Sequence, residues 1–347
     1  MKISSIGVTL PSLRVTNSDL LRQLVEVNQG VQQDQIRSSC TQIETLLKKA
    51  GAQTRFYRDR SRNETALPML LNAIGQALQG AEIRANEIDL LIYCGVGRGF
   101  LEPAMAYFVA SKLEISCECF DVTDACMSWV RALHIVDHFL AGSRYSNAMI
   151  INAEFNIYES GYPELMKIDS LQKWQYTFPA FTIGEAATAT VLTKSDDVWN
   201  FHFRSLPKHV GLCTIPLNGY RDYVSPETSD LGLNGVNKFM CFGEELSRTA
   251  SRAMTRFIKE TYPDPQGFKK WFPHTATARP YAHAAQRLGL NGKVYTSVFP
   301  KYGNLVSASI PAALWMAAQE NELHRGDRIV LCPISAGMSM ALVDLTY

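Results

Sequence analysis

Cys126 is the residue of this chain whose surroundings are best suited to produce a nucleophile. It follows a strand-like segment at 118–122 and precedes a helical pattern with an apolar stripe of Val130, Leu133, Val136 and Leu140. At a helix N-terminus, unpaired backbone N–H groups and the helix dipole lower a thiol pKa from about 8.5 toward about 3.5–7.5. Asp124 lies two residues ahead and, as a helix cap, would oppose that shift with its negative charge. We therefore treat Cys126 as a candidate nucleophile.

Two later polar residues could serve the same reaction. His274 follows a strand-like segment at 271–273, where catalytic groups often lie in α/β proteins. Asn304 stands in a turn that leads into a long apolar helix at 307–320. With the glycine-containing end at 335–337, the chain offers a nucleophile, two side-chain donors and backbone N–H groups for an oxyanion.

Other kinds of site fit these signals less well. A papain-like protease also has a His far beyond its Cys, but the sequence around Cys126 reads Asp-Ala-Cys-Met-Ser-Trp and lacks that class's signature. The glycines at 95–99 make a dehydrogenase a weak alternative, because their spacing is G-x-G-x-G. His134 and His138 have a spacing that can bind zinc, but without an H-E-x-x-H pattern we interpret them as packed or exposed helix residues.

The elements that must position these residues alternate along the chain. Compact apolar runs at 87–94, 148–153, 186–192 and 327–332 predict buried strands. Between them lie helical patterns, and the one at 64–78 is expected to stop at Gly80. Strands without polar alternation, separated by helices, indicate a sheet covered on both faces and hence an α/β fold.

Composition excludes several classes of protein. Lys and Arg number 34 against 33 Asp and Glu, and this balance argues against a nucleic-acid-binding protein. We therefore interpret the basic stretch of Arg55, Arg58, Arg60 and Arg62 as a solvated loop with local ion pairs. No apolar run approaches the ~20 residues that span a bilayer, and the N-terminus lacks the pattern of a signal peptide. We expect a cytoplasmic enzyme whose eight cysteines are reduced.

The order of elements repeats weakly in the two parts of the chain. In the first, a strand precedes Cys126, a helix and another strand. In the second, strand-like 270–273 precedes Asn304, the helix at 307–320 and a strand at 327–332. Such an echo predicts two pseudo-symmetric βαβ-type halves, at 1–194 with Cys126 and at 195–347 with His274 and Asn304.

Four motifs in this order resemble the β-ketoacyl-ACP synthase III family. They are DVTDACMSWVRAL at 121–133, WFPHTATAR at 271–279, KYGNLVSASIP at 301–311 and SAGMS at 335–339. Weaker matches from Ile6 to Glu245 extend the resemblance over nearly the whole chain. The resemblance implies a thiolase fold, with two similar halves in α-β-α-β-α layers, and a homodimer.

The resemblance also implies a role for each candidate. Cys126 would attack an acyl thioester and hold the acyl group. His274 and Asn304 would donate hydrogen bonds to the enolate formed when a malonyl-type thioester loses carbon dioxide. The backbone N–H groups of Cys126 and Ala336 would form the oxyanion hole. A neutral His274 suffices as a donor, so no metal or other cofactor is required, and the substrates would be phosphopantetheine thioesters of acyl carrier protein or coenzyme A.

The chain departs from the family pattern near the substrate. Thr45 and Lys49, in a lengthened segment at 27–50, replace the Trp and Arg that hold the adenine of coenzyme A. Phe100 and Glu102 occupy the region that reaches the partner subunit's acyl tunnel, where the family has an apolar residue in place of Glu102. Arg279 remains as a candidate contact for an acidic carrier protein.

These departures favour a relative from specialised metabolism. We expect a decarboxylative Claisen condensation between the acyl group on Cys126 and a malonyl- or β-ketoacyl-thioester. Two alternatives stay open: an acyltransferase that forms an ester or amide, and a noncatalytic partner subunit. Asn304 favours the condensation, because simple acyl transfer needs no enolate stabiliser.

Overall fold

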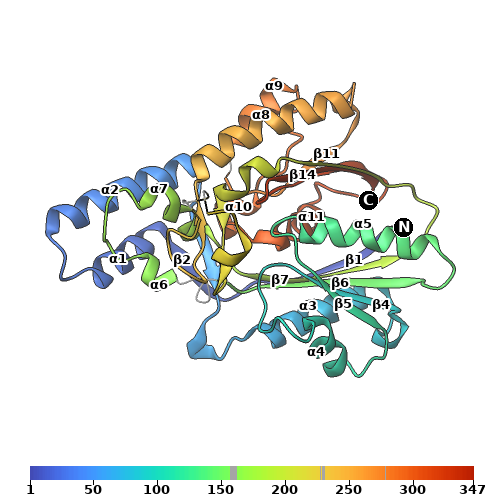
Figure 1. Cartoon of the computed structure of the whole chain (residues 1–347). Helices are drawn as coiled ribbons and strands as arrows, with labels where there is room; N and C mark the ends of the chain where they lie inside the picture. The colour runs from blue at the N-terminus through green and yellow to red at the C-terminus, as the bar shows by residue number, and fades with distance from the viewer. Residues whose placement is uncertain (157–161, 227, 229–230, 278) are drawn as a thin grey trace.

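The computed structural model describes residues 1–156, 162–226, 228, 231–277 and 279–347, and two β-sheets organise them (Figure 1). The first sheet has the strand order β1-β7-β6-β4-β5. β4 pairs in parallel with β5 and β6, whereas β7 is antiparallel to both β6 and β1. Its strands are β1 (Lys2–Thr9), β4 (Leu90–Cys94), β5 (Glu118–Val122), β6 (Asn147–Glu154) and β7 (Ala186–Thr193).

The second sheet has the order β11-β12-β14-β13, with β8 paired to β14. β11 and β12 are parallel, so both strands end at the same edge of the sheet. That edge is where His274 leaves β11. The strands are β8 (Asn200–Ser205), β11 (Lys270–Pro273), β12 (Arg328–Cys332), β13 (Ile334–Ser335) and β14 (Ser339–Thr346).

Helices lie between the two sheets and on both outer faces. In Figure 1, α5 and α11 lie between the sheets, α3 and α4 below the first sheet, and α8 and α9 above the second. The central core joins apolar residues of α5 and α11 to both sheets, which gives the layer order α-β-α-β-α. The α/β prediction is therefore confirmed. The helices are α3 (Ala66–Ala81), α4 (Met105–Lys112), α5 (Ser128–Ala141), α8 (Gly243–Thr261), α9 (Arg279–Arg287) and α11 (Ser309–Gln319).

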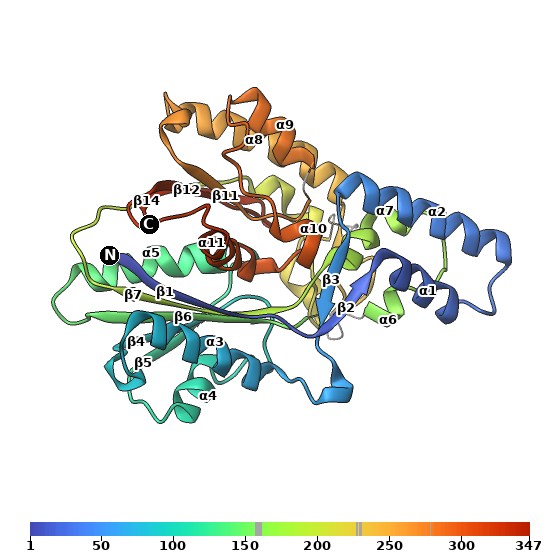
Figure 2. The same cartoon turned by 180° about the vertical axis from the view of Figure 1, so that it is seen from behind.

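A helical arm extends from one end of the sheets (Figures 1 and 2). The lengthened segment at 27–50 forms most of it, because apolar residues at helical spacing bury one face of α2. The arm contains α1 (Asn17–Val27), α2 (Gln33–Ala50), α6 (Tyr162–Leu165), α7 (Trp174–Thr177) and the hairpin of β2 (Leu13–Thr16) and β3 (Thr54–Tyr57). Further short elements are β9 (Cys213–Thr214), β10 (Met240–Cys241) and α10 (Val298–Tyr302).

One helix end differs from the prediction. α3 continues through Gly80 and ends at Ala81, after which Glu82 adopts a left-handed conformation with φ 57°. A Cβ atom at Gly80 would lie 2.3 Å from the Ser5 hydroxyl oxygen. Gly80 therefore permits close packing of α3 on β1 and does not stop the helix.

The two sheets are built from different parts of the chain. β7 ends at Thr193 and β8 begins at Asn200, so the expected boundary at 194/195 falls between the sheets. Both sheets contribute to one core, and α11 also contacts β1. The division into two repeated halves stays a prediction.

Within the described residues, no helix is both long enough and apolar enough to cross a membrane.

Candidate active site

Cys126 is displayed by a tight turn between β5 and α5. Ala125, directly before it, has φ 45°, a left-handed conformation that costs energy for a residue with a Cβ atom. The turn is closed by the Ser128 hydroxyl, which donates to the Ala125 carbonyl at 2.6 Å and accepts from the Asp124 N–H at 2.8 Å. The Cys126 side chain is partly buried and partly open. Such an arrangement presents a sulfur atom to a substrate.

The helix start differs from the prediction. α5 begins at Ser128, two residues after Cys126, and Asp124 does not cap it. The Asp124 carboxylate instead accepts from Arg131 at 3.1 Å. The Met127 N–H donates to the Ser335 hydroxyl at 3.2 Å, so a residue far along the chain takes part in this helix start. The prediction failed because Asp124 pairs with Arg131 of α5 itself and because Ser335, from a distant part of the chain, binds at the helix start.

The pKa of Cys126 shifts in the direction opposite to the expectation. Burial raises it well above its usual range, and the nearby Cys213 and Glu154 add to the shift, while the residue's own backbone N–H opposes it. The negative charge of Asp124 also raises it, as the sequence predicted. Burial and these charges outweigh the helix N-terminus, and the resting group is a neutral thiol.

His274 is a buried, neutral imidazole at the end of β11. Burial lowers its pKa to about 4, so the ring carries no charge at pH 7. Among the described residues, its Nδ1 atom has no hydrogen-bond partner. The Tyr281 hydroxyl donates to the His274 carbonyl at 2.5 Å. Burial also raises the pKa of Tyr281, with contributions from the nearby Cys332 and Cys126. Tyr281 therefore contacts His274 and lies close enough to Cys126 for the charge of the thiol to affect it.

Asn304 is held by both its backbone and its side chain. Its N–H donates to the Thr182 carbonyl at 2.8 Å, and its carbonyl accepts from the Gly184 N–H at 3.0 Å. The side-chain Oδ1 accepts from the Val306 N–H at 2.9 Å. Within the described part of the chain, nothing accepts from its Nδ2 group, which remains available to donate to a substrate oxygen. Gly303 (φ 78°) makes this turn feasible, since a Cβ atom there would lie 2.4 Å from the Thr182 carbonyl oxygen.

Contacts between distant segments relate the Cys126 turn and His274 to the same loop at 333–337. The Ser335 hydroxyl lies against the Cys126 turn, 3.3 Å from the Asp124 carbonyl. Pro273, just before His274, is the register partner of Cys332, so His274 and the loop at 333–337 leave the same sheet edge. The N–H of Ala336, the second predicted oxyanion donor, has no acceptor among the described residues.

Glu154 is a residue that the sequence analysis missed. It is fully buried at the end of β6 and accepts from the backbone N–H groups of Val96 (3.2 Å), Gly97 (2.9 Å) and Ser307 (3.3 Å). It also accepts from the Asn156 side chain at 2.7 Å and from the Ser307 hydroxyl. This carboxylate therefore ties the segment after Asn304 to the loop after β4. A single acidic residue at the end of an apolar strand was the available signal.

The structure bears on two alternatives from the sequence, a dinucleotide-binding loop at 95–99 and a zinc site at His134 and His138. The loop at 95–99 turns its N–H groups toward Glu154, so Val96 and Gly97 cannot offer them to the phosphates of a dinucleotide. His134 packs against Phe201, and the His138 ring bonds to the His134 carbonyl at 2.8 Å. Among the described residues, no group of three or more His, Cys, Asp or Glu could hold a metal ion.

The basic stretch near residue 55 differs from its interpretation as a solvated loop. Arg55 is fully buried, and Arg58 is only 8% exposed. Arg58 forms an ion pair with the buried Glu185 at 3.2 Å, and its backbone N–H donates to the same carboxylate at 2.7 Å. The interpretation was wrong for Arg55 and Arg58, which join the packed interior, whereas Arg60 and Arg62 are exposed and Arg62 pairs with Asp59 at 3.3 Å.

The remaining candidates lie away from these contacts. Phe100 is 51% exposed and stacks on Phe108 with ring centroids 4.7 Å apart, and Glu102 is also exposed. In the described chain, no contact joins either residue to Cys126. Arg279 begins α9, but its side chain falls outside the described residues, so its predicted contact stays a prediction.

Comparisons with known proteins show which family this chain resembles. The family model described as 3-oxoacyl-[acyl-carrier-protein (ACP)] synthase III C terminal matches residues 260–347. A β-ketoacyl-[acyl-carrier-protein] synthase III of Clostridium beijerinckii is 26% identical over 100% of this chain and 99% of that protein. The protein of the same name from Aquifex aeolicus is 27% identical over the same shares.

Solved structures show the same fold. The crystal structure of 3-oxoacyl-[acyl-carrier-protein] synthase III from Aquifex aeolicus has a TM-score of 0.78 and 24% identity, over 100% of this chain and 99% of that one. Xanthomonas campestris OleA, solved with bound lauric acid and lauroyl-CoA, has a TM-score of 0.80 and 21% identity over 99% and 98%. The predicted resemblance and fold class are confirmed.

Proposed function

We propose that this chain, a relative of the β-ketoacyl-ACP synthase III family, joins two acyl groups through a thioester on Cys126. The relatives support the general class, an acyl-transferring condensing enzyme that acts on acyl thioesters, as the sequence predicted. The residue roles, the acyl groups and their carrier are part of the proposal. A cytoplasmic location and a homodimer remain predictions.

The observation that carries the proposal is one neutral thiol placed among groups that can move a proton or stabilise an oxyanion. The Cys126 turn touches the loop of Ala336, and Tyr281, which bonds to the His274 carbonyl, is close enough to Cys126 to feel its charge. His274 has an unpartnered buried nitrogen and a pKa of about 4. Asn304 keeps its Nδ2 group available for a substrate. This set matches the needs of two successive steps that build negative charge on oxygen.

In the first step, the Cys126 sulfur attacks the carbonyl carbon of an acyl thioester. The thiol proton passes to His274, which is available as a base because it is neutral at pH 7. The backbone N–H groups of Cys126 and Ala336 stabilise the tetrahedral oxyanion. The carrier's sulfur then leaves with that proton, and the acyl group remains on Cys126.

In the second step, a malonyl- or β-ketoacyl-thioester enters the same region. Breaking the bond to its carboxylate releases carbon dioxide and leaves an enolate, whose oxygen accepts hydrogen bonds from His274 and the Nδ2 group of Asn304. The enolate carbon attacks the acyl carbonyl, and the Cys126 sulfur leaves. Each well-placed donor to such an oxygen contributes about 10²–10³ in rate.

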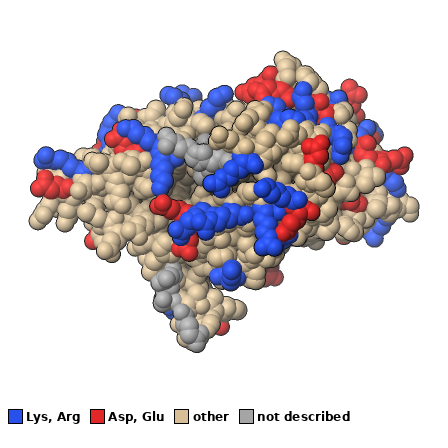
Figure 3. Space-filling view, turned by 90° about the horizontal axis from the view of Figure 1, so that it is seen from above, with Lys and Arg blue, Asp and Glu red and all other residues tan. Residues whose placement is uncertain are grey.

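Surface charge supports an acidic carrier protein. Lys and Arg side chains gather on the face in Figure 3, which views the molecule from the side on which α8 and α9 lie in Figure 1. On α8 the exposed cationic residues are Arg248, Arg252, Arg256 and Lys259. On α2, Thr45 is exposed and Lys49 pairs with Glu244 at 2.9 Å, so neither position supplies a flat platform for an adenine. We therefore favour acyl carrier protein over coenzyme A as the carrier.

A second candidate function is acyl transfer to an alcohol or amine. Retention of Asn304 with an available Nδ2 group argues for condensation, because transfer from an acyl-enzyme forms no enolate.

Phe100 and Glu102, exposed before α4, are proposed to contact the acyl tunnel of a partner subunit. A noncatalytic role would leave Cys126 unacylated.

Intact-protein mass spectrometry tests the loading step. Incubation with acyl-ACP or a synthetic acyl thioester should add the mass of one acyl group to the wild-type chain. Cys126→Ala should abolish the gain, whereas Cys40→Ala, which removes a partly buried thiol of α2, should retain it. Absence of labelling across a broad thioester panel would instead support a noncatalytic partner subunit.

A further inference from the structure

A second thiol site lies on the small two-stranded sheet beside Cys126. Its strands, β9 and β10, are antiparallel, and Cys213 and Cys241 are direct register partners. The next pair outward is joined by a hydrogen bond from the Phe242 N–H to the Leu212 carbonyl at 2.8 Å. Because hydrogen-bonded and non-hydrogen-bonded pairs alternate along an antiparallel ladder, Cys213 and Cys241 form a non-hydrogen-bonded pair.

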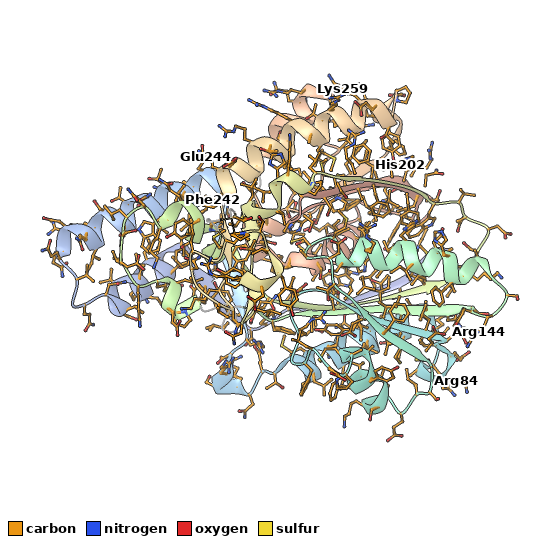
Figure 4. The ribbon with its side chains drawn as sticks, in the orientation of Figure 1. Arg84, Arg144, His202, Phe242, Glu244 and Lys259 are labelled. Carbon is orange, nitrogen blue, oxygen red and sulfur yellow. The ribbon has the colours of Figure 1, made fainter. Side chains whose placement is uncertain are left out.

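That register places the two cysteines within disulfide range. Opposed residues of a non-hydrogen-bonded pair have Cα atoms about 4.5 Å apart and side chains on the same face. Disulfides form across Cα separations of about 4.4–6.8 Å, so these strands need no large movement to be bridged. Phe242, which follows β10 directly, marks this position in Figure 4.

The two cysteines differ in exposure. Cys241 is 4% exposed, whereas Cys213 is only partly buried. A hydrogen bond with the Cys241 thiol, together with burial, raises the pKa of Cys213. Cys213 lies close enough to Cys126 for its charge to raise the pKa of Cys126. A small oxidant would therefore reach Cys213 before Cys241.

We propose that Cys213 and Cys241 are a reversible oxidation site, converted by a hydroperoxide into a disulfide between β9 and β10. The Cys213 sulfur, once deprotonated, attacks one peroxide oxygen, the O–O bond breaks, and a sulfenic acid forms with release of an alcohol or water. The Cys241 sulfur then attacks the Cys213 sulfur, the S–O bond breaks, and water leaves. The peroxide is reduced by two electrons, and the two thiols are oxidised by two.

The bridge would close the base of a long segment of the chain. The described parts of 214–240 have little regular structure, and Tyr223 within them is 90% exposed. Tyr220 donates to the Leu231 carbonyl at 3.1 Å, and Lys238 pairs with Glu164 at 2.5 Å. A disulfide at 213 and 241 would fix both ends of this segment next to Cys126. The site does not depend on the proposed condensation.

Peptide mapping tests the pairing directly. Folded protein is treated with stoichiometric hydrogen peroxide, the remaining thiols are blocked with N-ethylmaleimide, and trypsin is added. Cleavage after Lys and Arg places Cys213 in peptide 209–221, Cys241 in 239–248, and Cys117, Cys119 and Cys126 together in 113–131. We expect a linked peptide of 209–221 and 239–248, two hydrogens lighter than its parts, that separates on reduction with dithiothreitol. The yield should rise between pH 7 and pH 9, because the pKa of Cys213 is raised.

Three single variants control for linkage through other cysteines. Cys241→Ser and Cys213→Ser should each abolish the linked peptide, whereas Cys117→Ser should leave its yield unchanged. Cys117 is the matched choice because its sulfur lies 3.6 Å from that of Cys119, the other close thiol pair. A link between 113–131 and 209–221 would overturn the assignment by showing that Cys213 pairs with one of the three cysteines of 113–131. Full recovery of blocked, unlinked Cys213 and Cys241 would also overturn it.

Discussion

The chemistry of Cys126 depends on a proton that must leave during attack. Burial raises the pKa of the thiol and lowers that of His274 to about 4, so both groups are neutral at pH 7. A neutral thiol reacts slowly unless a base accepts its proton, and a neutral imidazole is such a base. Both shifts keep the resting groups neutral, and each makes transfer of the thiol proton to His274 less favourable before a substrate binds. His274 is our proposed acceptor, whereas the sequence alone pointed to a thiolate at the helix N-terminus.

The raised pKa of Cys126 predicts how free thiol reactivity depends on pH. Thiolate is the reacting form, so the rate of alkylation by iodoacetamide should climb from pH 7 to pH 9.5, by up to about tenfold per unit, without levelling off. The rate is followed by the mass of peptide 113–131, with Cys126→Ala to account for Cys117 and Cys119. A plateau that begins below pH 7.5 would show a thiolate already present.

At the scale of elements, glycines decide how closely α3 approaches the first sheet. A Cβ atom at Gly7 of β1 would lie 2.0 Å from the Ala73 carbonyl oxygen of α3, whereas Gly75 on the same helix has open space around it. Gly7→Ala should therefore lower the free energy of unfolding by about 3 kcal/mol, as forced overpacking does. Gly75→Ala should raise it by about 0.5–1 kcal/mol through helix propensity. Urea unfolding measures both changes, and equal effects would contradict this packing.

The sequence predicted the buried strands better than it predicted where helices begin and which side chains bind at their ends. The buried strands at 90–94, 148–153 and 186–192 could be predicted because fully covered strands carry continuous apolar runs. The start of α5 could not, because Ala125 takes a left-handed conformation and Ser335 binds the Met127 N–H. These features depend on contacts between residues far apart in sequence, which local patterns do not encode.

The candidate site was likewise hard to predict wherever it depends on contacts between residues far apart in sequence. Cys126, His274 and Asn304 could be named as candidates because their motifs resemble a family, and their roles stay a prediction. Glu154 and the ion pair of Arg58 with Glu185 could not, because their meaning comes from partners on other elements. The direction of the Cys126 pKa shift was likewise missed, since burial depends on packing of the whole chain.

At the scale of the whole molecule, Glu154 connects the first sheet to the segment that precedes α11. It accepts from Gly97 in the loop after β4 and from Ser307, three residues after Asn304. Glu154→Gln replaces one acceptor oxygen with an NH2 group that faces N–H donors. Unsatisfied buried groups cost about 1–3 kcal/mol each, so the free energy of unfolding should fall by about 3 kcal/mol. Glu26→Gln, on the exposed face of α1, is the control and should change it little. Equal unfolding midpoints in urea would refute this role.

Single-turnover analysis of His274→Ala tests most directly whether His274 stabilises the enolate in the condensation step. The variant and the wild type are first incubated with an acyl thioester and then with a malonyl thioester, and intact mass and released carbon dioxide are followed together. We predict that His274→Ala still accumulates acyl-Cys126, more slowly, but loses decarboxylative condensation by at least about 10²-fold, as removal of an oxyanion donor does. His209→Ala, on the partly exposed segment 207–212, should match the wild type in both steps. Condensation at the wild-type rate in His274→Ala would contradict the proposed role of His274 as a donor to the enolate oxygen.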